Sequence, residues 1–369
     1  MQSNNPTRSY LLNFSREELG EFIEEHDLER FRADQIFRGI YVHSLQEINQ
    51  LTTFSKSLRA KLSELTVLRT LTHSKTTRSP IDNTTKFLWE LSDGMFIESV
   101  IIYEGKRITF CISSQVGCAL DCQFCATGKM GFLRNLSTGE IVEQVLRMKD
   151  LAEGMPTNIV FMGMGEPMLN FKKVHKASYI LSDREGLTFS SKKITISTSG
   201  VIPGIKKMAD EDSPFSLAIS LNAVFEEKRR EIMPVSIQYP LEDLSKALKY
   251  YITKTGKKIT FEYILIAGKN DSRQDADQLI RFISRLPCKV NLIPCNSTDP
   301  DYPPPSKDKV YRFNEYINQK QRTATTRMRK GWEIQAACGQ LYAKSGSRVG
   351  TKITEQNEIK KKQSSKATK

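Results

Sequence analysis

The spacing of apolar residues predicts helices at the start of the chain. Up to about residue 65, apolar side chains recur every three or four positions, which is typical of amphipathic helices. Ser15 and Glu18 form a capping-box pattern ahead of the first apolar face, and two further faces follow over residues 31–41 and 58–65. We expect a small helical domain whose basic residues either contact nucleic acid or face water.

Between residues 66 and 112 the apolar spacing shifts towards two, which favours β-strands. Residues 85–91 and 95–103 are predicted strands joined at Ser92-Asp93-Gly94, a hairpin signal, and Glu104-Gly105 predicts a tight turn into residues 107–113. If that turn has two loop residues, Glu98 lies directly across from Cys111. A slip of one residue would remove this pairing of a carboxylate with a thiol.

From residue 113 onwards, predicted strands and helices alternate. The strands are expected at residues 158–162, 193–197, 215–220, 259–266, 289–293 and 323–328. The helices are expected after the Ser137–Glu140 capping box, near residues 174–181, in a short segment before residue 215, and at 241–254, 276–286 and 309–316. Such repeats predict a parallel α/β sheet, open or curled into a partial barrel.

Functional residues in parallel sheets gather at the carboxyl ends of the strands. Several residues stand at or just after predicted strand ends, and together with a cysteine cluster they would share one rim: Gly165, Glu166, Ser197, Ser220, Leu221, Asn222 and Asn296. Gly163-Met-Gly165 lacks the third glycine of a dinucleotide-binding loop, so a Rossmann site is disfavoured.

Cys118, Cys122 and Cys125 lie within eight residues, in the pattern C-x3-C-x2-C. Three thiolates at this spacing can converge on one soft metal centre. Zinc is the main alternative, but structural zinc sites use four ligands, and the four histidines lie far away in sequence. Because ordinary ferredoxin clusters also use four cysteines, an iron–sulfur cluster with one open iron is favoured.

Composition sets the class of protein. The chain has 369 residues, 39% of them hydrophobic, a mean hydropathy of −0.42 and no apolar run as long as a membrane span. The amino-terminal residues lack the pattern of a signal peptide, and seven cysteines do not form an even disulfide framework. We therefore expect a cytoplasmic protein without a membrane partner.

A net charge of +13 indicates a polyanionic partner such as RNA. Residues 344–369 contain eight Lys or Arg against two Glu, and we expect this basic tail to be disordered. The predicted organisation is a helical, RNA-binding domain over 1–65, a β-hairpin region over 66–112, a barrel with a catalytic cysteine segment over 113–343, and the tail over 344–369.

The cysteine motif, with Phe124 before its last cysteine, resembles the radical S-adenosylmethionine (SAM) superfamily. Five motifs in order resemble the RlmN-type RNA adenine C2-methyltransferases over nearly the whole chain. They are residues 113–122, Gly163-Met-Gly-Glu-Pro, Ser197-Thr-Ser-Gly, Asn291-Leu-Ile-Pro and Ala337-Cys338-Gly-Gln-Leu. The resemblance implies a radical SAM partial (βα)6 barrel with an amino-terminal helical domain and a β-hairpin extension.

The resemblance also implies roles for individual residues. Cys118, Cys122 and Cys125 would hold one 4Fe-4S cluster, and Cys338 would become S-methylcysteine with Cys111 as its partner thiol. Glu98 would accept a proton. The implied SAM contacts are Gly165, Glu166, Ser197, Ser220, Leu221, Asn222 and Asn296. From sequence alone, Cys111 and Cys338 also fit buried thiols without a reaction, whereas Cys288 and Cys295 are interpreted as packed thiols.

The implied reaction uses two SAM molecules per methylation. The first methylates Cys338; the second is cleaved reductively, and the resulting radical takes hydrogen from the S-methyl group, whose carbon then adds to adenine C2. Cys111 releases the product by forming a transient disulfide. The implied partners are 23S ribosomal RNA before full ribosome assembly, transfer RNA, and an electron donor such as flavodoxin or ferredoxin, with the enzyme a monomer.

Two positions depart from the family pattern. Asn222 stands where the family usually has histidine, which puts that SAM contact in doubt, and Cys295 replaces a common tryptophan, which alters packing near the cofactor. Two alternatives stay open at this stage: the related adenine C8-methyltransferase of 23S ribosomal RNA, which confers antibiotic resistance, and a non-catalytic RNA-binding protein stabilised by zinc or a cluster.

Overall fold

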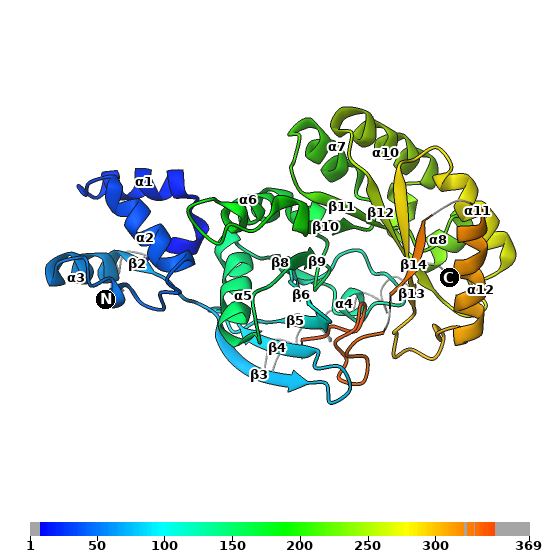
Figure 1. Cartoon of the computed structure of the whole chain (residues 1–369), viewed down its shortest axis with the longest axis horizontal. Helices are drawn as coiled ribbons and strands as arrows, with labels where there is room; N and C mark the ends of the chain where they lie inside the picture. The colour runs from blue at the N-terminus through cyan, green and yellow to red at the C-terminus, as the bar shows by residue number, and fades with distance from the viewer. Residues whose placement is uncertain (1–7, 321–322, 328, 344–369) are drawn as a thin grey trace, which may run out of the picture.

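A computed structural model describes residues 8–320, 323–327 and 329–343. Its amino-terminal part is helical, as the apolar spacing predicts, and lies to one side of the main sheet (Figure 1). The elements are β1 (Ser9–Tyr10), η1 (Leu11–Asn13), α1 (Arg16–Glu25), α2 (Phe31–Tyr41), η2 (Ile48–Gln50), α3 (Lys56–Leu65) and β2 (Thr66–Val67). The predicted capping box is confirmed, because the Ser15 hydroxyl accepts from the Glu18 N–H while the Glu18 carboxylate accepts from the Ser15 N–H.

One ten-stranded sheet forms the body of the molecule, in the order β14-β13-β12-β11-β10-β9-β6-β5-β4-β3. Neighbours from β6 to β14 are parallel, and β3 to β6 are antiparallel. The strands are β3 (Thr72–Arg78), β4 (Thr85–Glu90), β5 (Phe96–Glu104), β6 (Arg107–Cys111), β9 (Asn158–Phe161), β10 (Ile194–Thr198), β11 (Ser216–Ser220), β12 (Ile259–Leu265), β13 (Cys288–Pro294) and β14 (Ala324–Thr326).

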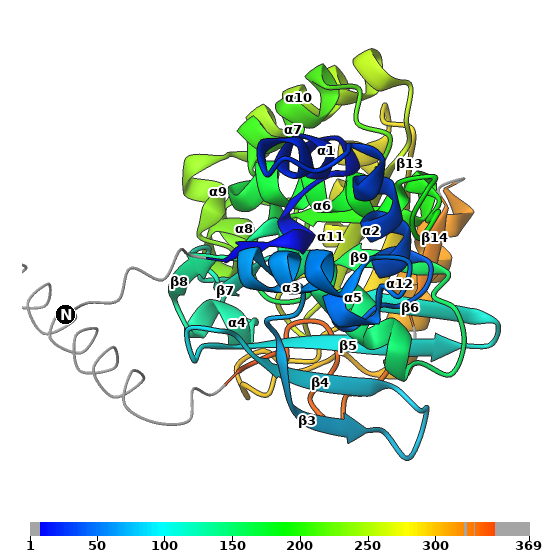
Figure 2. The same cartoon turned by 90° about the vertical axis from the view of Figure 1, so that its left-hand side faces the viewer.

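Helices follow the parallel strands and lie along the outside of the curved sheet (Figures 1 and 2). The long ones are α5 (Thr138–Leu151), α6 (Phe171–Ser182), α7 (Ile202–Asp210), α10 (Leu241–Thr255), α11 (Arg273–Ile283) and α12 (Lys307–Gln319). The shorter helices are α4 (Ala126–Lys129), η3 (Pro167–Asn170), η4 (Ser191–Lys193), α8 (Glu226–Ile232) and α9 (Val235–Gln238). The predicted alternation of strands and helices is confirmed, and the sheet is curled rather than flat.

The register predicted between β5 and β6 is wrong by two residues. The loop residues are Gly105 and Lys106, so Glu104 pairs with Arg107 and Val100, not Glu98, lies across from Cys111. Gly105 has a φ of +56°, a conformation that glycine adopts at little cost, and the turn is therefore centred one residue later than predicted. A two-residue shift preserves the faces of the strands, so Glu98 and Cys111 still share one face.

Five strands of the described residues were missing from the sequence prediction: the two-residue strands β1 and β2, and β3, β7 and β8. β3 is an edge strand made almost entirely of exposed polar residues, so it has no apolar alternation to detect. β7 (Gln115–Gly117) and β8 (Phe132–Asn135) form a short separate hairpin that flanks the cysteine motif. These strands are too short for a period-two pattern to be visible in sequence.

A buried carboxylate joins the amino-terminal segment to the sheet domain. Glu143 on α5 is fully buried, and its Oε2 accepts hydrogen bonds from the Tyr10 hydroxyl (2.5 Å) and the backbone N–H groups of Thr70 (2.8 Å) and Leu71 (3.1 Å). Its Oε1 pairs with Arg147 at 3.0 Å. These bonds satisfy the buried charge, as such groups require, and fix where the helical segment leaves the sheet domain.

Apolar side chains from both sheet faces and from the helices form one continuous core, in which Trp89, Phe110, Phe161 and Phe261 are essentially inaccessible to solvent. Within the described ranges, no helix is long and apolar enough to cross a membrane. The predicted basic tail, residues 344–369, lies outside the described residues.

Candidate active site

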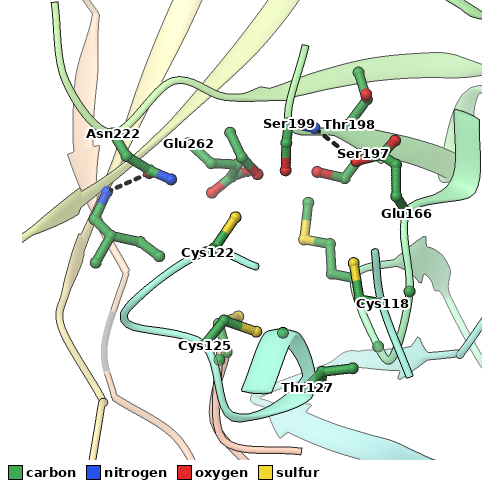
Figure 3. Close-up of a pocket in the computed structure, with 18 of the residues that line it drawn as sticks. Cys118, Cys122, Cys125, Thr127, Glu166, Ser197, Thr198, Ser199, Asn222 and Glu262 are labelled. Carbon is green, nitrogen blue, oxygen red and sulfur yellow. Dashed lines mark hydrogen bonds between the residues drawn. The ribbon is translucent and has the colours of Figure 1, made fainter. Parts of the chain in front are cut away.

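A cavity opens at the carboxyl ends of the parallel strands, where the sequence predicts the functional rim. It encloses about 900 Å³ of empty space, part of it open to solvent, a size suited to a cofactor. The three cysteines of the motif face it from one side, and polar side chains from the loops after β9, β10 and β11 face it from the other (Figure 3).

Backbone hydrogen bonds shape the loop that carries the cysteines. The N–H of Cys118 donates to Gly131 O (2.9 Å), and the N–H of Cys125 donates to Cys122 O (3.0 Å). Gly117 has a φ of +72°, and a Cβ there would lie 1.8 Å from Gly131 O, so only glycine fits where the loop begins. The sequence places three thiols close together, and this loop turns all three towards one cavity.

The cysteine side chains fit an incompletely ligated iron–sulfur cluster. Burial raises the pKa of Cys118 to about 12 and also raises the pKa of Cys122 and Cys125. Buried thiols of this kind are stabilised as thiolates when they bind a cationic metal centre. Within the described residues, no group of three or more His, Cys, Asp or Glu side chains is arranged to hold a single metal ion. Three thiols that face one cavity are suited to be the protein ligands of a cluster that keeps one open iron.

Glu166 lies opposite the cysteines, held by the turn after β9. Gly165 has a φ of +96°, and a Cβ there would meet the backbone N of Gln115 at 2.8 Å, so the turn requires glycine. The Glu166 carboxylate is buried and accepts from the N–H groups of Met168 (3.0 Å) and Ser199 (2.9 Å). Burial raises the pKa of this carboxyl, and an ammonium group bound beside it would favour the ionised form.

Of the other predicted SAM contacts, Ser197, Ser220 and Asn222 line the same cavity as Gly165 and Glu166. Leu221 is fully buried and does not line it, and Asn296 lines a second, adjoining cavity. Asn222 is also engaged by the protein itself, because its Oδ1 accepts from Ile264 N–H (2.9 Å). The residue that replaces the usual histidine thus links the end of β11 to β12.

The adjoining cavity is lined by both candidate reactive thiols, Cys111 and Cys338. Cys338 lines the first cavity as well, so it stands between the cysteine loop and Cys111. Burial, with a smaller contribution from Cys338, raises the pKa of Cys111 to about 12. Arg327 reaches the pair: its Nη1 lies 3.9 Å from the Cys338 Sγ, and the pKa of Arg327 is raised chiefly by its electrostatic interaction with Cys338.

Hydrogen bonds from distant parts of the chain hold the segment that carries Cys338. The N–H of Ala126 donates to Gly339 O (2.8 Å), and the Thr127 hydroxyl donates to Leu341 O (2.7 Å). On the opposite side, the N–H of Tyr342 donates to Glu98 Oε2 (2.9 Å). The segment is thus fixed between the cysteine loop and β5, two regions that the sequence does not show to be neighbours.

Glu98 is buried, and both of its carboxylate oxygens are engaged. Oε1 pairs with Lys86 Nζ at 2.9 Å, in addition to the bond between Oε2 and Tyr342. The side chain faces Lys86 and Tyr342 in a separate pocket and lines neither of the two cavities described above. The structure therefore gives Glu98 a contact with the catalytic segment, two residues along the strand from the position opposite Cys111.

Three charged residues of the site were not found from the sequence: Arg229, Glu262 and Arg327. Arg229 is fully buried behind the rim and donates to Leu221 O (3.0 Å) and Ser199 O (2.7 Å), which ties together the loops after β10 and β11. Glu262 on β12 faces the first cavity and accepts from Asn291 Nδ2 (2.7 Å). A charged residue inside an otherwise apolar strand was the only sequence signal for Glu262.

Comparisons with known proteins agree with this architecture. A family model described as the radical SAM superfamily matches residues 112–283, and one described as the ribosomal RNA large subunit methyltransferase N-terminal domain matches residues 10–68. A crystal structure of a radical SAM methyltransferase from Sphaerobacter thermophilus superposes with a TM-score of 0.88 at 39% identity. The match covers 91% of this chain and all of that one.

Curated relatives cover nearly the whole chain. The dual-specificity RNA methyltransferase RlmN of Anaeromyxobacter sp. (strain Fw109-5) is 43% identical over 325 residues, 86% of each protein. The probable dual-specificity RNA methyltransferase RlmN of Thermotoga neapolitana is 43% identical over 334 residues, 90% of this chain and 97% of that protein. Superfamily membership implies a 4Fe-4S cluster and SAM, for which the three cysteines and the cavity beside them are suited. The chain therefore belongs to the RlmN family of radical SAM RNA methyltransferases.

Proposed function

We propose that this enzyme methylates C2 of an adenine in 23S ribosomal RNA, and C2 of an adenine in transfer RNA, through an S-methylcysteine at Cys338. The observation that carries the proposal is the position of Cys338, which lines both the cavity of the cysteine loop and the cavity of Cys111. A thiol so placed can receive a methyl group on one side and be released by a second thiol on the other.

When bound, the cluster and SAM supply a methyl donor and one-electron chemistry, which an electron-poor carbon such as adenine C2 requires. Cys118, Cys122 and Cys125 would hold the cluster. Glu166 would bind the ammonium group of SAM, with Gly165, Ser197, Ser220 and Asn222 around it in the same cavity. Leu221 is buried behind this cavity and Asn296 lines the adjoining one, so the proposed contacts of these two residues with SAM require a local rearrangement. Two SAM molecules are consumed per methyl group transferred, one for each kind of chemistry, with electrons from a flavodoxin or ferredoxin.

Cys338 carries the transferred carbon. Its thiolate would attack the methyl carbon of SAM, so that an S–C bond forms as the sulfonium C–S bond breaks and S-adenosylhomocysteine leaves. One hydrogen atom would pass from the S-methyl group to the radical that the cluster and SAM supply when bound, and the carbon left with the unpaired electron would bond to C2 of the adenine. Arg327, close to Cys338 Sγ, is suited to hold this sulfur as the thiolate.

Cys111 releases the product. After the adduct has returned one electron to the oxidised cluster and given up the C2 proton, the Cys111 thiolate would attack Cys338 Sγ; an S–S bond forms, the bond from Cys338 Sγ to carbon breaks, and that carbon takes a proton to become a methyl group. Glu98, or a thiolate, accepts the C2 proton. To reach Glu98, that proton requires rearrangement of the Tyr342 contact or a relay through water, because both carboxylate oxygens are engaged.

The substrate adenosine must leave its stack to enter the cavity, as for other enzymes that modify bases. The helical segment over residues 1–65 has a net charge of −2, with eight Lys or Arg against ten Asp or Glu, so individual basic side chains such as Lys56 and Arg59 are the groups suited to hold surrounding phosphates, in 23S ribosomal RNA that is not yet fully assembled. We propose that the enzyme acts as a monomer.

Replacement of Cys111 tests the proposal most directly. The Cys111→Ala variant should leave RNA joined covalently to Cys338, because the S–C bond can no longer be broken by a partner thiol. Mass spectrometry of nuclease-treated protein would detect a nucleotide on the peptide that contains Cys338. Absence of an adduct would contradict the partner-thiol role, and a methyl group at C8 in RNA from the wild-type reaction would contradict C2 specificity.

A further inference from the structure

The turn that precedes Cys338 displays an exposed tryptophan. Trp332 is 47% exposed, although the neighbouring residues Gly331, Ala336 and Ala337 are buried. It lies at the start of a turn closed by hydrogen bonds from Gln335 N–H to Trp332 O (3.2 Å) and from Ala336 N–H to Gly331 O (2.8 Å). The turn belongs to the orange-red segment beside β4 and α4 in Figure 1.

Contacts on both sides of Trp332 hold this turn in place. Gly331 N–H donates to Asp82 Oδ2 (3.0 Å), and the Glu333 carboxylate accepts from the Ser79 hydroxyl. Gly331 has a φ of +60°, and a Cβ there would lie 2.6 Å from Thr84 Cγ2, so the backbone is pressed against the β3–β4 connection. The indole is therefore presented by an ordered backbone, which lowers the entropy lost when it binds a ligand.

A guanidinium group accompanies the indole. Arg329 lies over the Trp332 ring at 5.1 Å from its centroid, and its Nε donates to Asn296 Oδ1 at 2.8 Å. Arg329 and Lys330 also line the cavity that contains Cys111 and Cys338. The aromatic and cationic surface is therefore continuous with the site of carbon transfer.

The charged residues that line this cavity are all basic. Arg327, Arg329 and Lys330 line it, and no aspartate or glutamate does. Within the described part of the chain, none of the three has a carboxylate partner within 4.0 Å. A cationic wall next to an exposed, ordered indole matches a chain of phosphates that carries unpaired bases.

We propose that Trp332, supported by Arg329, is a stacking platform for an unpaired nucleotide adjacent to the target adenosine. This inference rests on the proposed function, because it assumes that an adenosine of the RNA enters the neighbouring cavity. By stacking on the nucleotide next to the target, Trp332 would hold the RNA open while the adenine is turned out of its helix. Trp332 acts here as a binding and positioning residue, since the methyl group passes through the two thiols.

The tryptophan content makes this platform directly observable. The chain has two tryptophans, and the other, Trp89, is fully buried and donates to Ser99 Oγ at 2.6 Å. Acrylamide should therefore quench mainly Trp332. A short single-stranded RNA of mixed sequence should quench the fluorescence and protect it from acrylamide, whereas an abasic RNA of equal length and charge should bind without either effect. The Trp332→Phe variant should lose the signal.

Steady-state kinetics provide a second measurement. Leucine cannot stack on a base, so Trp332→Leu should raise the KM for RNA about tenfold and leave kcat within about twofold. Phenylalanine can still stack, so Trp332→Phe should raise KM only about twofold. Tyr311→Leu is the matched control, because Tyr311 is 63% exposed on α12, outside both cavities, and its loss should not change KM.

The outcomes separate this inference from the proposed function. If wild-type enzyme methylates RNA at C2 but RNA leaves Trp332 fluorescence unchanged, or Trp332→Leu keeps the wild-type KM, the platform is refuted and the function stands. If the wild type methylates Cys338 but never the RNA, the proposed function fails. Should Trp332→Leu not fold by circular dichroism, the fluorescence of the wild type and of Trp332→Phe decides the question.

Discussion

The three cysteines of the cluster loop and the thiol pair Cys111–Cys338 are positioned by different means. The loop is local: its cysteines lie within eight residues, and its shape depends on nearby backbone hydrogen bonds. The pair joins the end of β6 to the carboxyl-terminal segment, and Cys338 depends on contacts from Ala126, Thr127 and Glu98. Local geometry was readable in the sequence, whereas the pair exists only once the whole fold is formed.

The largest expected effect separates the two sets of thiols. The Cys118→Ala variant should lose the cluster, because two thiolates do not retain a 4Fe-4S cluster. It should therefore neither cleave SAM nor methylate RNA. Cys338→Ala should lose RNA methylation completely while keeping the cluster, since Cys338 is not among its ligands. Iron content, visible absorbance and deoxyadenosine release measure these properties. A Cys338→Ala protein that cannot bind iron would show that the two regions are not independent.

A pair of glycines tests the rim of the cofactor cavity. Gly165 and Gly94 both have positive φ, but a Cβ at Gly165 would collide with Gln115, whereas at Gly94 nothing lies within 4 Å. Gly165→Ala should weaken SAM binding at least about tenfold, because the turn that presents Glu166 must shift. Gly94→Ala should cost only about 1 kcal/mol of stability. Calorimetric SAM titration and thermal unfolding compare the two, and equal SAM affinities would contradict the role of this turn.

Two substitutions of Glu98 separate its chemistry from its structural contact. Glu98→Gln keeps an oxygen for Tyr342 N–H but cannot take a proton, so RNA methylation should fall about 100-fold while Cys338 is still methylated. Glu98→Ala also removes the carboxylate that pairs with Lys86, which then keeps its bond to Gln335 O (3.0 Å), at a cost of about 3 kcal/mol. Rapid-quench assays and limited proteolysis of the carboxyl-terminal segment measure the two effects. Full activity in Glu98→Gln would leave Glu98 only the structural role.

The last prediction concerns alkaline stability. Burial raises the pKa of Cys111 from 9.0 to about 12, so the folded state keeps this proton over a range in which the unfolded chain loses it. The free energy of unfolding should therefore fall as the pH rises from about 9 to 12, by at most about 4 kcal/mol from this thiol. Denaturant titrations should show a shallower decline in Cys111→Ala. Parallel curves for both proteins would contradict this assignment.

Much of the fold was predictable because its signals are local. The capping boxes at Ser15 and Ser137 begin helices α1 and α5 as expected, and the strand and helix order after residue 137 is confirmed. The register of β5 and β6 was wrong, because Glu104-Gly105 and Gly105-Lys106 are both acceptable turns and only packing decides between them. The polar strand β3 gave no apolar signal at all.

The site was predictable only in part, for a similar reason. Cys118 and Glu166 stand in short motifs, so their cavity could be expected from the sequence. Arg229 donates to the carbonyls of Ser199 and Leu221, and its role depends on where two loops meet. Lys86 and Glu98 form an ion pair across neighbouring strands. The contact of Glu98 with Tyr342 could not be predicted, because Tyr342 lies more than 240 residues later in the chain.

The bond between Ala126 N–H and Gly339 O has a consequence for biosynthesis. Cys338 follows every strand of the described part of the sheet, so under the proposed function the residues that would hold the cluster and SAM are translated before the thiol that would accept the methyl group. A transcript truncated before codon 338 would therefore encode a protein that could cleave SAM but could not methylate RNA. Coupling between the cluster site and this thiol begins when the last turns of the nascent chain close over the cysteine loop.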